Sequence, residues 1–375
     1  GLLKPSLKGT HANEQTRGDV MTDLRPVQEL QESESPVSCI TFGQESLHKF
    51  YVLLATASKD GTVVIYRCYR TEMEIAMLSD SSVLQDDHSK GIIMEVHSKL
   101  VGHSRAITSI FFNLLEDQLV TTSVDKSFCF WSVDTGEMIK KFTVEAPVNV
   151  ASFLPFNPQV ILAANTNAVL RLINVCNGMV QQKLKIEAEV GALRFDDTGL
   201  FLLAGTTEGS IHVLEASDSS TLKFKIKVQL ALGKVTHITF VPCCAGQPSC
   251  LLVNTMSSDS SVAIIDCTYG PPAGDLTNLT NLTVRHRVRV ANSLLPLKCC
   301  YSPSGKGFLI SGSEDKEVCV YSLAQGANYK FGSLKHHEVP VIAVACNLQD
   351  TLLASADSSG RVILWRRMDF THIQE

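Results

Sequence analysis

Seven times along this chain, a run of apolar and β-branched residues leads through a short polar turn into a second run that closes on an aromatic or large aliphatic residue. The clearest copy holds the pair Gly102-His103 and the runs 119–125 and 128–131, the last of which ends in a tryptophan. The final copy repeats the second half of this pattern between residues 352 and 365. Short apolar runs bounded by turn residues form strands, and one such unit cannot bury its own apolar face. The copies must therefore pack against one another.

The spacing of the copies predicts the architecture. Their closing residues are Tyr66, Trp131, Ile173, Leu214, Ile265, Tyr321 and Trp365. Successive gaps are 65, 42, 41, 51, 56 and 44 residues, and segments 67–100, 241–250 and 267–295 hold the surplus of the wide gaps. A period of about 40–45 residues with a Gly-His pair and a closing tryptophan is typical of four-stranded blades in a ring. The sequence predicts an all-β fold, a seven-bladed β-propeller of four-stranded antiparallel blades.

The chain is predicted to be one domain with a polar arm in front of it. Residues 1–22 lack periodicity and are expected to be a flexible N-terminal arm, while residues 23–375 form the propeller. The blade repeats are expected near residues 36–66, 102–143, 147–186, 189–228, 234–290, 295–331 and 336–366. The last copy has no good fourth strand, whereas segment 24–31 is strand-like. Because unpaired edges invite aggregation, we expect 24–31 to close the ring as the outer strand of the last blade.

Composition restricts the partners and the compartment. A net charge of −5 and a pI near 6.1 argue against a general nucleic-acid binder. No apolar run reaches the roughly 20 residues that span a bilayer, and the N-terminus lacks the order of a signal peptide, so no membrane partner is expected. Several cysteines fall inside predicted strands, as reduced core thiols do, which favours an intracellular location in the nucleus, the cytoplasm or both. Cys243, Cys244 and Cys250 lack the spacing of a zinc site, and no metal is expected.

One constellation could be mistaken for a catalytic site. His103, Thr121, Asp125 and Trp131 fall within a single copy, and a histidine, a hydroxyl and a carboxylate also make up a hydrolytic triad. These residues resemble the buried network of the WD-repeat family, in which histidine links the aspartate to a hydroxyl and that hydroxyl accepts from the indole. The resemblance implies a structural tetrad in which burial demands that each polar group be satisfied.

The other copies are expected to keep only parts of this tetrad. The seventh offers His337, Ser355 and Trp365 but has Ser359 where the aspartate is expected, and the first copy lacks the histidine. The second copy alone is therefore predicted to carry the network whole.

The sequence contains no phosphate-binding loop, no nucleophile elbow and no zinc-protease motif. We expect no catalytic residue, no cofactor and no small-molecule substrate. The family resemblance covers residues 36–366 and implies a non-catalytic protein–protein interaction scaffold or adaptor of a multiprotein complex, with partners of unknown identity. Several segments further resemble one branch of the family, a largely nuclear scaffold without known chemistry; they are 100–105, 192–199, 311–315, 352–357 and 365–367.

The repeat frame of the family also names residues expected on the narrow face of the ring, where a partner peptide or loop would bind. They precede the turn carboxylate or flank the start of an inner strand, and they are Ser38, Lys59, Ala106, Thr108, Val124, Asn149, Thr166, Gly191, Thr207, Thr236, Ser258, Glu314, Ile342 and Ser358. We expect this face to be small, neutral and rich in hydroxyl groups.

A single concentrated basic run, residues 285–289, contains Arg285, Arg287 and Arg289 on alternate positions. The simpler interpretation is an outer edge strand protected by charge. The other is an anion contact, which would make the chain an RNA-associated scaffold subunit with nucleic acid as part of its complex. A propeller hydrolase is a remote third interpretation, since it would need convergent carboxylates or metal ligands in the central channel.

Overall fold

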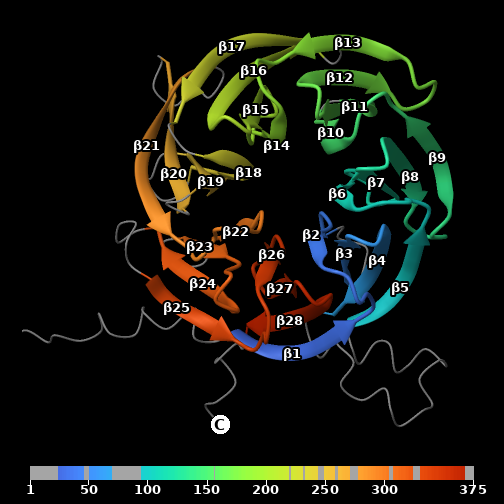
Figure 1. The fold of residues 1–375 in the computed structure, drawn as a ribbon, viewed down its shortest axis with the longest axis vertical. Coiled ribbons are helices and arrows are strands. Elements are labelled where there is room, and N and C mark those ends of the chain that lie inside the picture. The colour runs from blue at the N-terminus through green and yellow to red at the C-terminus, as the bar shows by residue number, and fades with distance from the viewer. Residues whose placement is uncertain are drawn as a thin grey trace, which may run out of the picture.

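The computed structural model is a closed ring of seven four-stranded antiparallel sheets around a central axis (Figure 1). It describes residues 24–45, 50–69, 94–155, 157–218, 221–230, 233–243, 249–257, 261–270, 278–303, 307–323 and 330–367. The arm predicted for residues 1–22 lies outside the described residues. The predicted all-β, seven-bladed architecture is confirmed.

Each blade contributes one strand to each of four concentric positions, and the blades are numbered 1 to 7 in the chain order of their inner strands. The inner strands are β2 (Val37–Phe42), β6 (Ile107–Phe112), β10 (Val148–Leu154), β14 (Val190–Phe195), β18 (Lys234–Val241), β22 (Cys299–Ser302) and β26 (Val341–Cys346). The second strands are β3 (Val52–Ser58), β7 (Gln118–Ser123), β11 (Asn157–Asn165), β15 (Phe201–Thr206), β19 (Cys250–Met256), β23 (Phe308–Ser311) and β27 (Leu352–Asp357). The third strands are β4 (Thr62–Cys68), β8 (Ser127–Ser132), β12 (Val169–Asn174), β16 (Ser210–Asp218), β20 (Ser261–Tyr269), β24 (Glu317–Ser322) and β28 (Arg361–Arg367). The outer strands are β5 (Met94–Val101), β9 (Met138–Thr143), β13 (Val180–Lys185), β17 (Thr221–Gln229), β21 (Leu279–Arg289), β25 (Lys330–Lys335) and β1 (Leu24–Gln31).

The N-terminal strand closes the ring. Strand β1 pairs antiparallel with β28, from Leu24 opposite Arg367 to Gln31 opposite Arg361, and it completes the sheet that contains β26 and β27. In Figure 1 this first strand lies beside the last one, at the outer edge between β25 and β5. Blade 7 is thus built from both termini, as the missing fourth strand of the last copy predicted.

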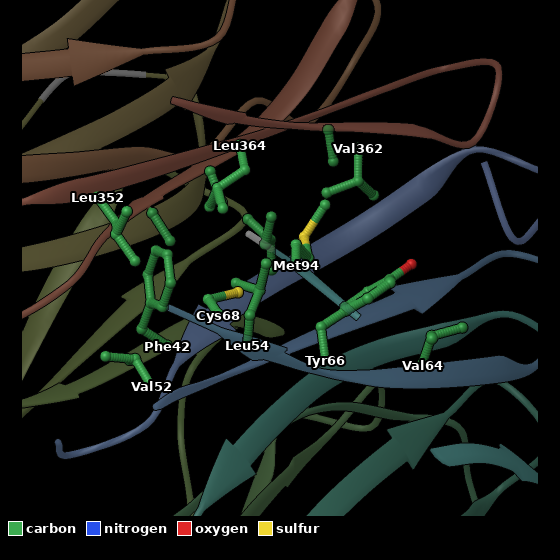
Figure 2. Packing of buried hydrophobic residues seen from close by; sticks show 14 of the residues in the cluster. Phe42, Val52, Leu54, Val64, Tyr66, Cys68, Met94, Leu352, Val362 and Leu364 are labelled. Atoms are coloured by element: carbon green, nitrogen blue, oxygen red, sulfur yellow. The ribbon is translucent and has the colours of Figure 1, made fainter. Parts of the chain in front are cut away.

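Buried side chains form seven clusters, and each cluster lies between two neighbouring blades. Figure 2 shows the one at the seam of the ring, where Leu54 and Tyr66 of blade 1 face Leu352 and Leu364 of blade 7. A second strand packs against a blade on each side, and every residue of β3 and β15 is accordingly buried. The outer strands β9 and β13 contact one layer only, so their residues alternate between exposed and half-buried.

The turns between second and third strands need a left-handed residue. Gly61, Gly209 and Gly360 supply it with φ of 91°, 79° and 94°, while Lys126 and Ala168 adopt the same region at 66° and 59° despite their side chains. No helix in the described part of the chain has the length and apolarity to cross a membrane.

Candidate interaction surfaces and the networks beneath them

The blade 2 tetrad is a closed chain of hydrogen bonds. The Trp131 indole donates to Thr121 Oγ1 at 2.9 Å, and Thr121 lies 2.7 Å from His103 Nε2. His103 Nδ1 lies 3.0 Å from Asp125 Oδ2, whose carboxylate also accepts from Ser127. These partners assign a neutral imidazole that accepts at Nε2 and donates at Nδ1. Thr121 is completely buried, so its hydroxyl is out of reach of a substrate although its hydrogen bonds resemble those of a hydrolytic triad.

The protonation states agree with this arrangement. Burial lowers the pKa of His103 and keeps the ring neutral, although the Asp125 carboxylate opposes the shift. Burial alone would raise the pKa of Asp125, but hydrogen bonds from Ser127, His103 and the Ser104 amide outweigh it and hold the pKa at about 2. The tetrad therefore pairs an ionised Asp125 carboxylate with a neutral His103 ring.

The expectation that only blade 2 carries a whole network is wrong. In blade 7, His337 Nδ1 lies 2.7 Å from Asp357 Oδ2, His337 Nε2 lies 2.7 Å from Ser355 Oγ, and the Trp365 indole donates to Ser355 at 2.8 Å. The carboxylate comes from two positions before the predicted one, and Ser359 donates to it through its amide and its hydroxyl. The turn is short enough that a carboxylate at position 357 or at position 359 can reach the same imidazole. Position in the repeat alone therefore did not identify Asp357.

Blade 1 replaces the histidine with a hydroxyl. Ser33 stands where blades 2 and 7 have His103 and His337, and its Oγ donates to Asp60 Oδ2 at 2.7 Å. Asp60 Oδ1 also accepts from the amide and the hydroxyl of Thr62. The turn is thereby anchored without an imidazole.

The predicted narrow-face residues do gather on one face, which we call the top face: the side where the inner strands begin. The turn residue before the carboxylate position donates its amide to the residue directly before an inner strand in five blades, and in blade 6 to Ala291, which lies in the segment between β21 and β22. The donors are Lys59, Val124, Thr166, Thr207, Glu314 and Ser358, and the acceptors are Pro36, Ala106, Pro147, Glu189, Ala291 and Pro340. Ser258 lies outside the described residues.

Several of the predicted hydroxyl groups bond the ring together. In blades 1, 2, 3 and 5, an irregularity near the start of the inner strand leaves one residue out of the strand pairing, and the side chain of that residue reaches the next blade. Ser38 donates to the Ile107 carbonyl at 2.8 Å, Thr108 to Val148 at 2.7 Å, Asn149 to Val190 at 3.0 Å and Thr236 to Leu297 at 3.3 Å. At the same position Gly191 leaves no room for a side chain, because a Cβ would lie 2.5 Å from the Val235 carbonyl oxygen. Ile342 is buried and accepts at its carbonyl from the Lys298 amide at 2.9 Å.

A cavity of about 370 Å³ continues from the top face along the axis, and its lining contains Lys59, Lys234, Lys298 and Arg194 against the single carboxylate Glu189. The neutral character expected of the top face itself stays a prediction. Of the predicted face residues, Ser38, Lys59, Ala106, Thr108, Asn149, Gly191 and Thr236 line this cavity. Sequence reasoning missed Arg194 and Lys298, because their charges come from different blades and form no local motif.

On the opposite face, which we call the bottom face, the structure shows linked loops that were not predicted from the sequence. Loops of blades 7, 1 and 2 are joined there by buried carboxylates: Glu45 Oε1 accepts from the Gln349 amide at 3.1 Å, and Glu116 Oε1 accepts from the Glu45 amide at 3.0 Å. Both glutamates have left-handed backbones, with φ of 58° and 55°. A third such residue, Asp350, accepts from Ser302 Oγ of blade 6 at 2.7 Å.

These joined loops expose large apolar side chains. Leu114, Leu115 and Leu348 are 61%, 74% and 71% exposed, and Phe50 of the blade 1 loop is exposed as well. A pocket of about 220 Å³ adjoins Leu114, and Phe153 is among the aromatic and proline residues that line it. Exposed apolar side chains grouped on one face are a common feature of protein interaction sites.

The basic run is the outer strand of blade 5, and two of its arginines are engaged. Arg285 forms an ion pair with Asp266 through both Nε and Nη2, and Arg287 Nη2 donates to the Leu230 carbonyl at 3.1 Å. Arg289 is exposed. No group of three His, Cys, Asp or Glu side chains within the described residues is placed to hold a metal ion.

Comparison with known proteins agrees with the geometry. The model of the WD domain, G-beta repeat family matches residues 24–67, 94–132 and 329–366, which contain the closing strand and the two His–Asp networks. The chain contains WD repeats in these three segments. Its segment-level resemblance to WD repeat-containing protein 13 is not tested by these comparisons and stays a prediction.

Two curated relatives and one solved structure align with most of this chain. It is 23% identical to "Set1 complex component swd1" of Schizosaccharomyces pombe over 71% of the chain, and 23% identical to "Retinoblastoma-binding protein 5 homolog" of Drosophila melanogaster over 89%. It spans 67% and 63% of the length of these relatives. The propeller domain of Myceliophteria thermophila Cps50 (Swd1) superposes over 92% of the chain with a TM-score of 0.68 at 19% identity, a likeness that shows the fold alone.

Proposed function

We propose that this chain is a non-catalytic scaffold subunit of a multiprotein complex and that it holds partner proteins on the faces of its ring. Its relatives include proteins named as components of the Set1 complex and of COMPASS, which supports a place among several subunits. The buried histidine networks are fully used in holding turns, which supports a structural role for the residues that most resemble a triad.

The bottom-face loops carry this proposal. Hydrogen bonds to Glu45 and Glu116 hold three loops side by side, so the exposed Leu114, Leu115 and Leu348 are presented on a fixed backbone. A rigid apolar surface loses little conformational entropy on binding, which favours a partner of matching shape. A partner helix or loop with apolar anchors would bury these side chains.

The test is partner recovery with Leu114→Glu combined with Leu348→Glu. Both side chains point to solvent, so the variant should keep its melting temperature and lose the proteins that copurify with the wild type. Met179→Glu is the matched control, because Met179 is 66% exposed at the outer rim of blade 3. Recovery of the same proteins by the double variant would contradict binding at the bottom face.

The top face is the second candidate surface, since Leu294 is 81% exposed there in a loop whose backbone amides bond Glu314. Substituting Thr108 or Asn149 would break bonds between blades, so Thr166→Arg with Leu294→Glu is the better probe. Loss of a different set of partners from this variant would assign separate proteins to the two faces. If neither face variant loses any partner, the scaffold proposal fails.

We further propose an intracellular location in the nucleus, the cytoplasm or both. Buried cysteines such as Cys68, Cys129 and Cys299 are free thiols, which supports a reducing compartment. Imaging of a fluorescent fusion tests this, and export to the medium would contradict it. The RNA-associated alternative has no observation in its favour, since Arg285 and Arg287 already bond protein groups.

A further inference from the structure

The axial cavity has the size of a small-ligand site. Its volume of about 370 Å³ lies near the lower end of the roughly 300–1,000 Å³ that is typical of such pockets. Inner strands β2, β6, β10, β14 and β18 and the segment before β22 all contribute to its wall. The site therefore exists only when the ring is closed.

The wall is strongly positive, although the chain as a whole has a net charge of −5. Lys59 and Lys234 stand at the top rim, Lys298 directly precedes β22, and Arg194 lies near the far end of β14. These cations follow one another from the mouth of the cavity into the ring. A ligand with more than one anionic group would meet them in turn.

None of these cations is neutralised by a contacting carboxylate within the described residues. The one carboxylate of the wall, Glu189, accepts instead from Asn149 Nδ2 at 2.8 Å. Lys298 Nζ has the Cys39 sulfur at 2.9 Å as its hydrogen-bond partner. Arg194 also lines the neighbouring bottom-face pocket, where Asp197 interacts with it electrostatically.

The cations of the cavity wall are accessible to solvent, since Lys59, Arg194 and Lys234 are exposed and Lys298 is half-buried. The protein around Arg194 lowers the pKa of its guanidinium, and Asp197 opposes this shift. Burial, with Lys298 and Arg194 nearby, lowers the pKa of His237 to about 3, so this ring is neutral at physiological pH. A multivalent anion in the cavity could pair with several of these accessible cations at once.

We propose that the axial cavity binds a small multivalent anion that carries two or more phosphate or carboxylate groups, with Arg194 and Lys298 as its principal contacts. The planar guanidinium matches the paired oxygens of phosphate and carboxylate, and the lysine adds a mobile point charge. Lys59 and Lys234 would hold a second anionic group at the rim. This inference does not depend on the scaffold function.

Isothermal titration calorimetry of the full chain with pyrophosphate and with citrate, at low ionic strength, tests the proposal. We expect one site for at least one of the two anions and no heat from sodium chloride at matched ionic strength. Arg194→Gln and Lys298→Met should each weaken the affinity at least about tenfold, because each removes a charged contact. Lys183→Gln is the control, since Lys183 is an exposed cation on the outer strand β13.

A second measurement needs no variant. An amine-acylating reagent modifies accessible lysines, and saturating anion should protect Lys298 at least about fivefold relative to Lys183, as quantified by peptide mass spectrometry. The proposal is overturned if neither anion binds at millimolar concentration. It is equally overturned if binding leaves Lys298 unprotected and survives in Arg194→Gln, because the anion then binds elsewhere.

Discussion

The role of Asp357 as the carboxylate of the blade 7 network can be tested by exchanging it with Ser359. Asp357 is 1% exposed, and it accepts hydrogen bonds from His337 Nδ1, the Ser359 hydroxyl, and the amides of Ser359 and Arg361. Burial alone would raise the pKa of Asp357, but the bonds from His337 and Ser359 outweigh it and hold the pKa below its ordinary value. Asp357→Ser removes this ionised acceptor and leaves the buried imidazole without its partner.

The size of the effect follows from these contacts. A hydrogen bond to a charged group contributes about 1.5–3 kcal/mol, and serine replaces part of the lost bonding, so we expect a net loss of about 3 kcal/mol. Unfolding entropy of about 2.1 cal/mol/K per residue gives about 0.8 kcal/mol/K for the 375 residues. The melting temperature should therefore fall by about 4 °C.

The exchange should reverse this loss. Asp357→Ser combined with Ser359→Asp reproduces the blade 2 arrangement, in which Ser123 accepts from the Asp125 amide and Asp125 bonds His103. Ser359→Asp alone places two carboxylates in one turn and should destabilise the fold through like-charge repulsion. The double variant should then melt within about 2 °C of the wild type, well above either single variant.

The melting temperatures of the wild type, the two single variants and the double variant, measured by calorimetry or circular dichroism at pH 7, test this prediction. A double variant whose loss equals the sum of the single losses would show that the two positions are not interchangeable. A melting temperature of Asp357→Ser equal to that of the wild type would refute the importance assigned to the network.

Three further predictions concern closure, pH and thiols. Removing residues 1–31 should lower the melting temperature or cause aggregation, because β1 pairs along β28, whereas removing residues 1–23 should do neither. Equal melting temperatures of the two truncated proteins would contradict closure of the ring by β1. The pKa of His237 is about 3 in the folded state against 6.5 in the unfolded state, so the stability that this residue contributes is present above pH 6.5 and is lost as the pH falls towards 3. In His237→Gln the melting temperature should therefore depend less on pH between pH 6.5 and 4, and a pH dependence equal to that of the wild type would count against this assignment. The sulfurs of Cys300 and Cys346 lie 3.3 Å apart on blades 6 and 7, so diamide should join them in a disulfide found by peptide mapping. Burial and the neighbouring Cys346 raise the pKa of Cys300, so this reaction should be faster at pH 9 than at pH 7, and recovery of both thiols unmodified at pH 9 would refute the geometry.

Most of the ring could be predicted from local pattern. Alternating apolar runs gave the strands, the period gave seven blades, and the missing fourth strand after Trp365 placed segment 24–31 at the seam. The frame also placed the turn residues on one face, where their amides bond the inner-strand starts. These features repeat within about 40 residues, a range in which backbone periodicity and turn chemistry decide the structure.

The positive charge of the axial cavity and the histidine network of blade 7 were not predicted. Asp357 serves from two positions outside the frame, because reach in space and not position in the repeat selects the acceptor. The hydroxyl groups expected to be free at Ser38 and Thr108 are used between blades, since a carbonyl of the next blade lies within reach.

By itself, then, the sequence determined which segments become strands, how many blades they form and how the two termini share the last one. Only the tertiary structure decided which side chains lie together on the faces of the ring and along its axis. Arg194, His237 and Lys298 belong to three different blades, and only closure brings their charges to one axis. In the same way, Glu45 and Glu116 join loops that are distant in sequence and hold exposed leucines on one face. Such sites depend on distances between blades, which no single repeat encodes.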